Sequence, residues 1–439
     1  MTSTRVTQPV TASVTETLRV AAEVALPTLA GGVIKRRPVA MAVAGKLQFD
    51  RSAVRLLRRL RDRYQGRPLK LRVPGRSVEL VLSGADVGAV LAGAPTPFSP
   101  STVEKRAALG HFQPHGVLIS DVVDRGPRRK FTEAVLETGR PLHGLAAPFA
   151  RAIADEAAVL LSEVAHAGSL DWDTFTVAWW RLVRRVVLGS AARDDETLTD
   201  LLERLRLDAN WAYLHPQRKR VREQFRQRLT AHLGRAEPGS LAAAIAAVGD
   251  DGTAADQVAH WLFAFDAAGM ATYRTLALLA THPAALDRAR TELSGLDLTE
   301  PNQLSYLRAC VLDAVRLWPT TPMILRETTE DTSWGRAGTT VLIFTPFFHR
   351  DAALPYADRF EPDMWLDGRA AENPALVPFS AGPAICPGRD LVRFCASTML
   401  ANLVRDHGFE QTSGPVLAPE NPLPATLDNF HLSFRPLPA

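Results

Sequence analysis

The feature that most constrains this fold is a long helical stretch, from about Ala254 to His282, that is apolar on almost every side. A helix of this kind needs apolar neighbours on all faces, so it belongs in the middle of a large protein. The chain has 439 residues, which is enough to provide those surroundings. Pro283 marks the expected end of the helix. The sequence therefore predicts a large fold built around one buried helix.

Helical patterns dominate the rest of the chain, and β-structure is expected only in short pieces. The further helical patterns lie at about 49–64, 128–236, 304–317 and from 388 onward. A hairpin pattern covers 69–83, and a strand pattern covers 339–344. No internal repeat or low-complexity linker divides the chain. We expect one mainly α domain with small β-sheets over residues 46–439, preceded by an N-terminal extension over 1–45.

Composition and charge exclude several classes of protein. Apolar residues make up 46% and charged residues 22%, as in folded globular chains and unlike disordered ones. The net charge of +4 is too small to indicate nucleic-acid binding. The apolar run 20–34 contains Glu23, Pro27 and two glycines, so it is too short and interrupted to cross a membrane. We expect a cytoplasmic monomer without a transmembrane anchor or a nucleic-acid partner.

The chain has three cysteines, Cys310, Cys386 and Cys395, and none forms a CxxC pair. This excludes a disulfide framework and a mainly Cys-based zinc site. Cys386 lies in the pattern Phe-x-x-Gly-x-x-x-Cys-x-Gly, formed by Phe379, Gly382, Cys386 and Gly388, just before a helix start. Backbone N–H groups there stabilise a thiolate, and no His close in sequence equips it for hydrolysis. It fits a single soft ligand to iron, the alternative being a buried core cysteine.

At this pattern the sequence resembles the cytochrome P450 (heme-thiolate) family, soluble bacterial type. The resemblance implies that Cys386 binds heme b iron and that the heme lies between this loop and the long helix. Asp313 and Arg316 stand where the family has Glu-x-x-Arg, and Arg359 matches the third member of that buried ion network. Phe379, Gly382 and Gly388 would shape the heme loop.

Heme carries two propionates, which need cations. By resemblance, Arg326 on a strand and the pair Arg125 and Arg129 at a helix start would bind them. One departure affects this set, because Ala384 stands where the family usually has Arg or His two residues before the cysteine. One propionate contact is therefore absent or supplied from elsewhere.

The long helix would cross the oxygen-binding side of the heme. There the family usually shows an acid followed by an alcohol, and this chain has Asp266 followed by Ala267. A methyl group cannot donate the hydrogen bond that the alcohol gives, so a water or a substrate hydroxyl would have to replace it. Thr272 is poorly placed to do so. Asp266 is either a functional acid or the partner of an arginine on this side of the heme.

The resemblance implies a monooxygenase that uses oxygen, and electrons from a separate ferredoxin and ferredoxin reductase, to oxidise a small, largely apolar molecule of secondary metabolism. The substrate pocket would include Phe263, Phe265, Thr321, Met323 and Ile324. Two alternatives stay open. Ala267 is compatible with peroxide-driven or otherwise atypical chemistry, and a heme-binding sensor would need no turnover. Two basic runs are either solvated helix faces or docking sites for an acidic ferredoxin: Arg55, Arg58, Arg59, Arg61 and Arg63, then Arg181, Arg184 and Arg185.

Overall fold

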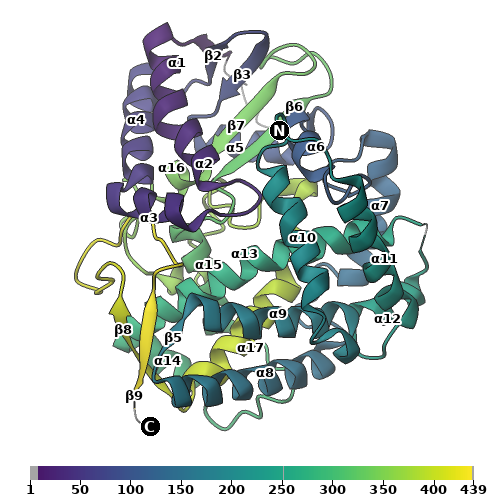
Figure 1. Cartoon of the computed structure of the whole chain (residues 1–439). Coiled ribbons are helices and arrows are strands. Elements are labelled where there is room, and N and C mark those ends of the chain that lie inside the picture. The colour runs from purple at the N-terminus through teal and green to yellow at the C-terminus, as the bar shows by residue number, and fades with distance from the viewer. Residues whose placement is uncertain (1–7, 251, 438–439) are drawn as a thin grey trace.

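A computed structural model describes residues 8–250 and 252–437 of the chain. Its larger part is helical, and its smaller part joins a β-sheet to the N-terminal helices (Figure 1). The α-helices are α1 (Val14–Val20), α2 (Leu26–Gly31), α3 (Pro38–Leu47), α4 (Phe49–Tyr64), α5 (Gly84–Ala92), α6 (Val103–Leu109), α7 (Val122–Leu136), α8 (Ala146–Ala167), α9 (Trp172–Leu188), α10 (Glu196–Ala209), α11 (Lys219–Arg235), α12 (Leu241–Val248), α13 (Ala254–Thr281), α14 (Pro283–Leu293), α15 (Ser305–Leu317), α16 (Thr345–His349) and α17 (Arg389–Val404). The π-helix η1 (Ala21–Ala25) joins α1 to α2, and short 3-10 turns lie at η2 (Ser190–Ala192), η3 (Pro362–Trp365) and η4 (Gly382–Ala384). The predicted mainly α fold with small sheets is confirmed.

Helix α13 occupies the centre of the helical part, as its all-round apolar character predicts. Helices α9, α15 and α17 pack against it. The indole of Trp179 on α9 donates to the carbonyl oxygen of Phe265 at 2.8 Å. A Cβ on Gly269 would lie 2.8 Å from the Trp179 ring, so a glycine is needed for this close packing. The contact fixes the rotation of α13 relative to α9.

The strands form two sheets. The six-stranded sheet has the order β1-β2-β3-β7-β6-β4, with strands β1 (Val10–Thr11), β2 (Leu69–Val73), β3 (Arg76–Leu80), β4 (Phe98–Ser99), β6 (Met323–Thr328) and β7 (Thr340–Phe344). The three-stranded sheet has the order β5-β9-β8, with strands β5 (Leu170–Asp171), β8 (Gly408–Ser413) and β9 (Ser433–Leu437). The predicted hairpin is present as β2 and β3, with Leu69 opposite Leu80. Strand β7 pairs with β3 in parallel, and this pairing brings β6 and its Arg326 into the same sheet.

The N-terminal segment from residue 8 onward contacts both parts of the molecule. Val10 pairs with Leu69 in the larger sheet. The amide oxygen of Asn210, just after α10, accepts from the backbone N–H of Ile34 at 3.0 Å, and its nitrogen donates to the Lys35 carbonyl at 2.7 Å. The division of the chain at residue 45 stays a prediction. Within the two described ranges, no helix is long and apolar enough to cross a membrane.

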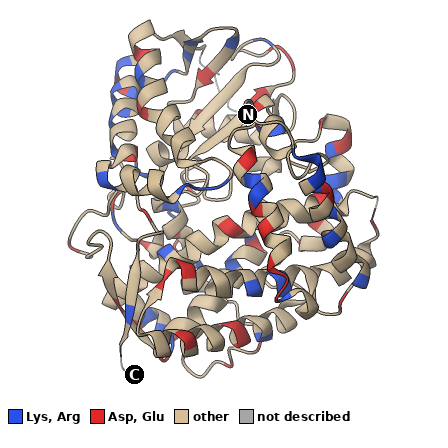
Figure 2. Ribbon diagram, viewed as in Figure 1, with Lys and Arg blue, Asp and Glu red and all other residues tan. Residues whose placement is uncertain are grey.

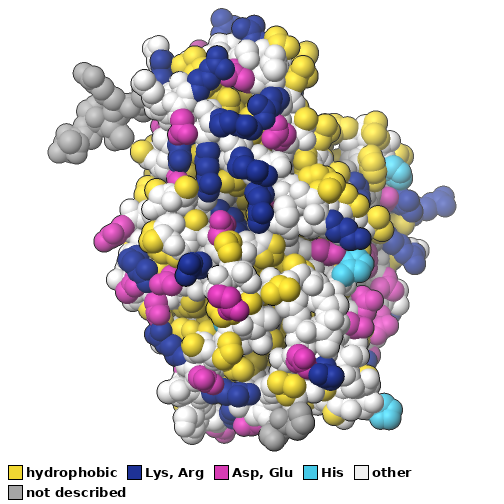
Figure 3. All heavy atoms as spheres, turned by 90° about the vertical axis from the view of Figure 1, so that its left-hand side faces the viewer, with side chains coloured by type: hydrophobic (Ala, Val, Ile, Leu, Met, Phe, Trp, Pro, Cys, Tyr) yellow, Lys and Arg dark blue, Asp and Glu magenta, His cyan; other side chains and the backbone are white. Residues whose placement is uncertain are grey.

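The two basic runs have different surroundings. On α9, Arg184 is buried and donates to the Arg193 carbonyl, while Arg181 and Arg185 pair with acidic residues of α8. On α4, four exposed arginines follow one another at intervals of four, namely Arg51, Arg55, Arg59 and Arg63. Positions four apart share a helix face, and basic side chains cluster along this helix and on its side of the molecule (Figures 2 and 3). Only the α4 run therefore presents a continuous basic surface.

Candidate active site

Cys386 lies in a tight loop between the 3-10 turn η4 and helix α17. Its backbone N–H donates to the Phe379 carbonyl at 3.0 Å, which closes the loop between the two residues of the predicted motif. Phe379, Gly382, Cys386 and Gly388 are all at least partly exposed in this structure. The loop therefore presents the thiol and the Phe379 ring on a side that the protein does not fully cover.

The two glycines of the motif have different neighbours. Gly382 has φ +65°, and a Cβ there would lie 2.1 Å from the Leu91 carbonyl oxygen of α5, so this position excludes every side chain. A Cβ on Gly388 would meet only the Leu136 methyl at 3.6 Å, which is an ordinary contact. Packing against Leu91 thus explains the glycine at position 382. No protein contact explains the glycine at position 388, so the space beside it can accept a group that the chain does not supply.

Burial raises the pKa of the Cys386 thiol. The backbone N–H of Gly388 donates to the sulfur, and the positive charges of Arg129 and Arg389 also favour the thiolate. These opposing effects suit a metal ligand, because a bound cation supplies the charge that makes a buried thiolate stable. The other two cysteines are wholly buried core residues, as expected.

Near the Cys386 loop, three basic side chains converge. Arg326 donates from Nη2 to the Ser380 hydroxyl at 3.0 Å and from Nη1 to the Leu325 carbonyl at 3.0 Å, and its Nε is buried without a partner. Arg125 donates to the Val117 carbonyl at 2.8 Å. Lys105 donates to the Pro100 carbonyl at 2.7 Å and to that of Leu325 at 2.9 Å. All these acceptors are uncharged.

We call Lys105, Arg125 and Arg326 the cation cluster. Burial lowers the pKa of Arg125 to about 10 and that of Arg326 to about 10, with Arg125 adding repulsion on Arg326. Burial also lowers the pKa of Lys105 well below its usual value, and both arginines add to that effect. Like charges held this close need an anion, and two carboxylates of a cofactor meet that need. Arg129, the remaining predicted propionate partner, pairs with Glu133 at 2.6 Å.

One face of α13 is incompletely covered in its middle. His260, Phe263, Ala264 and Ala267 are partly exposed, whereas the residues between them are buried. The spacing of three, four and seven places them on one face. Ala267 therefore belongs to the open face, as the sequence predicts for the distal alcohol position. Thr272 cannot substitute, because it is fully buried and its hydroxyl donates to the Ala268 carbonyl at 2.8 Å.

Asp266 is buried and pairs with an arginine. Arg206 on α10 donates from Nη2 to Asp266 Oδ2 at 2.5 Å and from the same nitrogen to the Ile34 carbonyl at 3.1 Å. Burial alone would raise the pKa of Asp266, but Arg206, with Lys35 and Arg36, holds it below its usual value. Of the two roles left open for Asp266, the structure shows the ion pair. No sequence pattern identified Arg206, because α10 and α13 meet only in the tertiary fold.

The predicted pocket residues lie in different surroundings. Phe263 is on the open face of α13 and meets the Phe112 ring at a centroid distance of 5.7 Å. Phe265 packs against Trp179 in the main core, so we leave it out of the pocket proposed below. Met323 and Ile324 belong to β6, Met323 partly exposed and Ile324 buried. Thr321 is exposed just before that strand.

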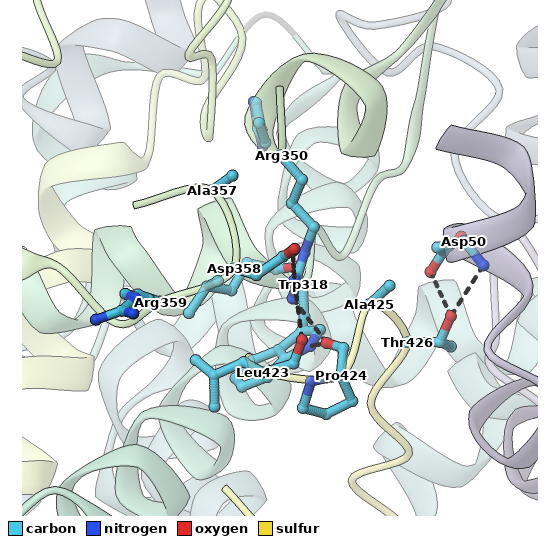
Figure 4. Close-up of polar contacts among 12 residues, drawn as sticks. Asp50, Trp318, Arg350, Ala357, Asp358, Arg359, Leu423, Pro424, Ala425 and Thr426 are labelled. Atoms are coloured by element: carbon cyan, nitrogen blue, oxygen red, sulfur yellow. Dashed lines mark hydrogen bonds and ion pairs between the residues drawn. The ribbon is translucent and has the colours of Figure 1, made fainter. Parts of the chain in front are cut away.

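The predicted ion network is present with one change. Arg316 pairs with Asp313 through Nε to Oδ1 at 2.5 Å and Nη2 to Oδ2 at 3.1 Å, and both side chains are fully buried. Arg359 takes part through its carbonyl, which accepts from Arg316 at 2.6 Å, whereas its side chain is exposed and points away from the nearby contacts (Figure 4). The exposed guanidinium differs from the predicted buried one, because the turn directs the main chain of this residue inward.

A second buried arginine lies beside this network. Arg350 donates to Asp358 at 2.6 Å, to the Leu317 carbonyl at 3.0 Å and to the Pro424 carbonyl at 2.7 Å (Figure 4). It ties α15 to the segment before β9. Two residues after Pro424, Thr426 donates to Asp50 of α4 at 2.9 Å. These contacts join α4, α15 and the segment before β9.

A central helix with one open face, a lone cysteine on a glycine-bounded loop and a cation cluster beside that loop are the features that the resemblance to heme-thiolate proteins implies. Comparison with known sequences agrees, since the profile of the family Cytochrome P450 matches residues 251–428. This matched segment contains α13, the Asp313–Arg316 pair and the Cys386 loop, and it is less than half of the chain. The mainly helical fold with small sheets is consistent with the predicted P450 fold.

Similar proteins come from distant organisms. Cyclooctat-9-en-7-ol 5-monooxygenase of Streptomyces melanosporofaciens is 35% identical over 156 residues, which is 32% of this chain and 33% of the relative. Probable cytochrome P450 4s3 of Drosophila melanogaster is 32% identical over 30% of this chain and 28% of the relative. Methyltetrahydroprotoberberine 14-monooxygenase of Papaver somniferum is 31% identical over 31% of this chain and 29% of the relative. The matches span a third or less of each relative's length.

Proposed function

We propose that this protein is a heme-thiolate monooxygenase that oxidises a small, largely apolar molecule. The observation that carries the proposal is that the cation cluster and Cys386 contact adjacent residues of one loop. Arg326 donates to the Ser380 hydroxyl, and the Cys386 N–H donates to the Phe379 carbonyl. Cys386 would bind the iron, and the cluster would bind the two propionates of heme b. Bound heme supplies oxygen activation and oxygen transfer to the substrate.

The side chains of α13 set the conditions on the substrate side. Asp266 is held as a carboxylate by Arg206, so it accepts hydrogen bonds and can pass on a proton only when the ion pair opens. Ala267 presents a methyl group in place of a hydroxyl donor. A water or a hydroxyl of the substrate therefore has to make the missing hydrogen bond.

The proposed substrate pocket is mainly apolar. Phe263, Ala264 and Ala267 lie on the open face of α13, and Phe112 meets Phe263 from the loop after α6. Met323 supports an apolar wall at the start of β6. Such a lining favours an uncharged molecule that carries at most a few polar groups. A hydroxyl on that molecule would make the hydrogen bond that the methyl group of Ala267 cannot donate. An apolar substrate with such a hydroxyl would suit an enzyme of secondary metabolism.

Electrons would come from a separate ferredoxin and its reductase. Arg389 and Arg393 at the start of α17 and Lys130 on α7 lie on the elements that flank the Cys386 loop, and Lys130 is exposed. A basic surface next to the iron ligand suits an acidic donor protein. The electron-transfer rate should then fall as the salt concentration rises.

The test of the function is spectroscopic first and catalytic second. Purified protein should contain heme b, and its reduced carbon monoxide complex should show the red-shifted band of thiolate ligation. Apolar compounds that perturb the heme spectrum are then supplied with a ferredoxin, its reductase and NADPH, or with hydrogen peroxide. Product formed only with peroxide would favour the peroxide-driven alternative. Spectral binding without product under either supply would contradict the proposal and favour a sensor.

The substitution Ala267→Thr tests how the missing hydroxyl is replaced. If oxygen is activated in the usual way, a threonine here should raise the product formed per NADPH consumed, because a fixed donor replaces a mobile one. The measurement is product and released peroxide against NADPH for the best compound. Ala264→Thr, on the same open face, is the matched control and should not improve this ratio. An unchanged or lower ratio for Ala267→Thr would assign the task to water or substrate.

A further inference from the structure

Lys105 is held next to Arg326 by two backbone carbonyls. Its Nζ donates to the carbonyls of Pro100 at 2.7 Å and Leu325 at 2.9 Å, and Leu325 is the residue before Arg326. An ammonium group has three donors, so two bonds to carbonyls leave one donor for another acceptor. Lys105 is half-buried on the short helix α6, far in sequence from the Cys386 motif.

The carboxylates closest to Lys105 already have partners. Glu104 pairs with Arg76, and Glu327 pairs with Arg106 at 3.2 Å. Glu327 also accepts from the backbone N–H of Val103 at 3.1 Å. In the described part of the chain, the hydrogen bonds of Lys105, Arg125 and Arg326 all go to uncharged oxygens. The cation cluster therefore has no acidic hydrogen-bond partner among these contacts, and it calls for an external anion with more than one negative charge.

The Cys386 loop lacks one basic residue that the resemblance leads us to expect, so a third cation from elsewhere could take its place. The loop that carries Cys386 has Ala384 where the resemblance implies a basic residue, and Ser380 in the same loop accepts a hydrogen bond from Arg326 of the cluster. We propose that Lys105 is a carboxylate-binding residue of the heme site and replaces the basic side chain missing at position 384. This inference rests on the proposed heme-thiolate function and assigns a new residue to it.

The test compares the wild type and Lys105→Met with two probes, heme and heme dimethyl ester, whose carboxylates are blocked. Heme loss is followed by transfer to apomyoglobin. A hydrogen bond to a charged group is worth on the order of a tenfold change in affinity or more. We expect Lys105→Met to lose heme about tenfold faster than the wild type and to lose the ester at the wild-type rate. Met keeps the length of the stem, and urea unfolding of the apoprotein checks that the variant folds.

Two further variants sharpen the result. Lys46→Met, on the exposed end of α3, is the matched control and should leave both rates unchanged. Ala384→Arg added to Lys105→Met should restore the slow loss of heme, because it places a cation on the Cys386 loop, whose Ser380 contacts the cluster. If Lys105→Met lost heme and the ester equally faster, the residue would have a packing role and the proposal would be wrong. An unchanged rate of heme loss would also overturn it.

The two proposals fail in different ways. A wild type without the red-shifted band of the reduced carbon monoxide complex contradicts the heme-thiolate function itself. A wild type that shows the band, with a Lys105→Met variant that holds heme equally well, contradicts only the role of Lys105. When the inference is correct, Lys105→Met keeps the band while it loses heme faster, because Cys386 still binds the iron.

Discussion

Cys386→Ala is expected to remove the red-shifted band of the reduced carbon monoxide complex completely, together with turnover. The loop presents one thiol, and the structure gives it a hydrogen bond from Gly388 and the charges of Arg129 and Arg389 in support of the thiolate. No methyl group can donate electrons to iron. The measurement is the difference spectrum of the reduced protein with and without carbon monoxide.

The other cysteines provide matched controls. Cys310→Ala and Cys395→Ala remove thiols that are wholly buried in the main core, and burial raises the pKa of Cys395 to about 12. Both variants should keep the band and lose only some stability. Cys386→His should hold heme but shift the band to that of a histidine-ligated iron. A full band in Cys386→Ala would place the iron ligand elsewhere.

Local patterns in the sequence predicted the parts of the site that are contiguous in the chain. All the residues that define the Phe379 to Gly388 motif or the apolar stretch of α13 are close together in the sequence, so each feature can be identified without the structure. Contacts between distant segments carried no such signal. The Asp266 pair needs Arg206 from α10, and Lys105 lies beside Arg326 because the carbonyls of Pro100 and Leu325 accept its hydrogen bonds.

Where the sequence pattern named a side chain, the structure sometimes uses the main chain. Arg359 contributes its carbonyl to the Arg316 network, and the pattern of residue types could not distinguish a carbonyl from a guanidinium. The basic run on α9 departs from its pattern in another way, because the side chains of Arg184 and Arg185 are engaged within the fold. At Ala384 the sequence predicted only that one propionate contact is absent or supplied from elsewhere, and it did not single out Lys105.

Arg316→Met is expected to lower the free energy of unfolding by about 3–5 kcal/mol, the cost of leaving one partner of a buried ion pair alone. Asp313 would keep its hydrogen bonds from the Glu361 N–H at 2.7 Å and the Trp365 indole at 3.2 Å but would lose its only cation contact among the described residues. The carbonyls of His349, Ala357 and Arg359 would also lose a donor. Urea unfolding of the apoprotein, with the slope of the transition unchanged, measures the loss.

Arg359→Met is the decisive control for this network. Its guanidinium is exposed and its carbonyl survives the substitution, so the loss should stay within about 0.5 kcal/mol. The double variant Asp313→Asn with Arg316→Met should lose less than the sum of the two single variants, because neither charge is then buried alone. If Arg359→Met lowered the free energy of unfolding as much as Arg316→Met, the Arg359 guanidinium would be part of the buried network. That result would contradict the main-chain role argued from the structure.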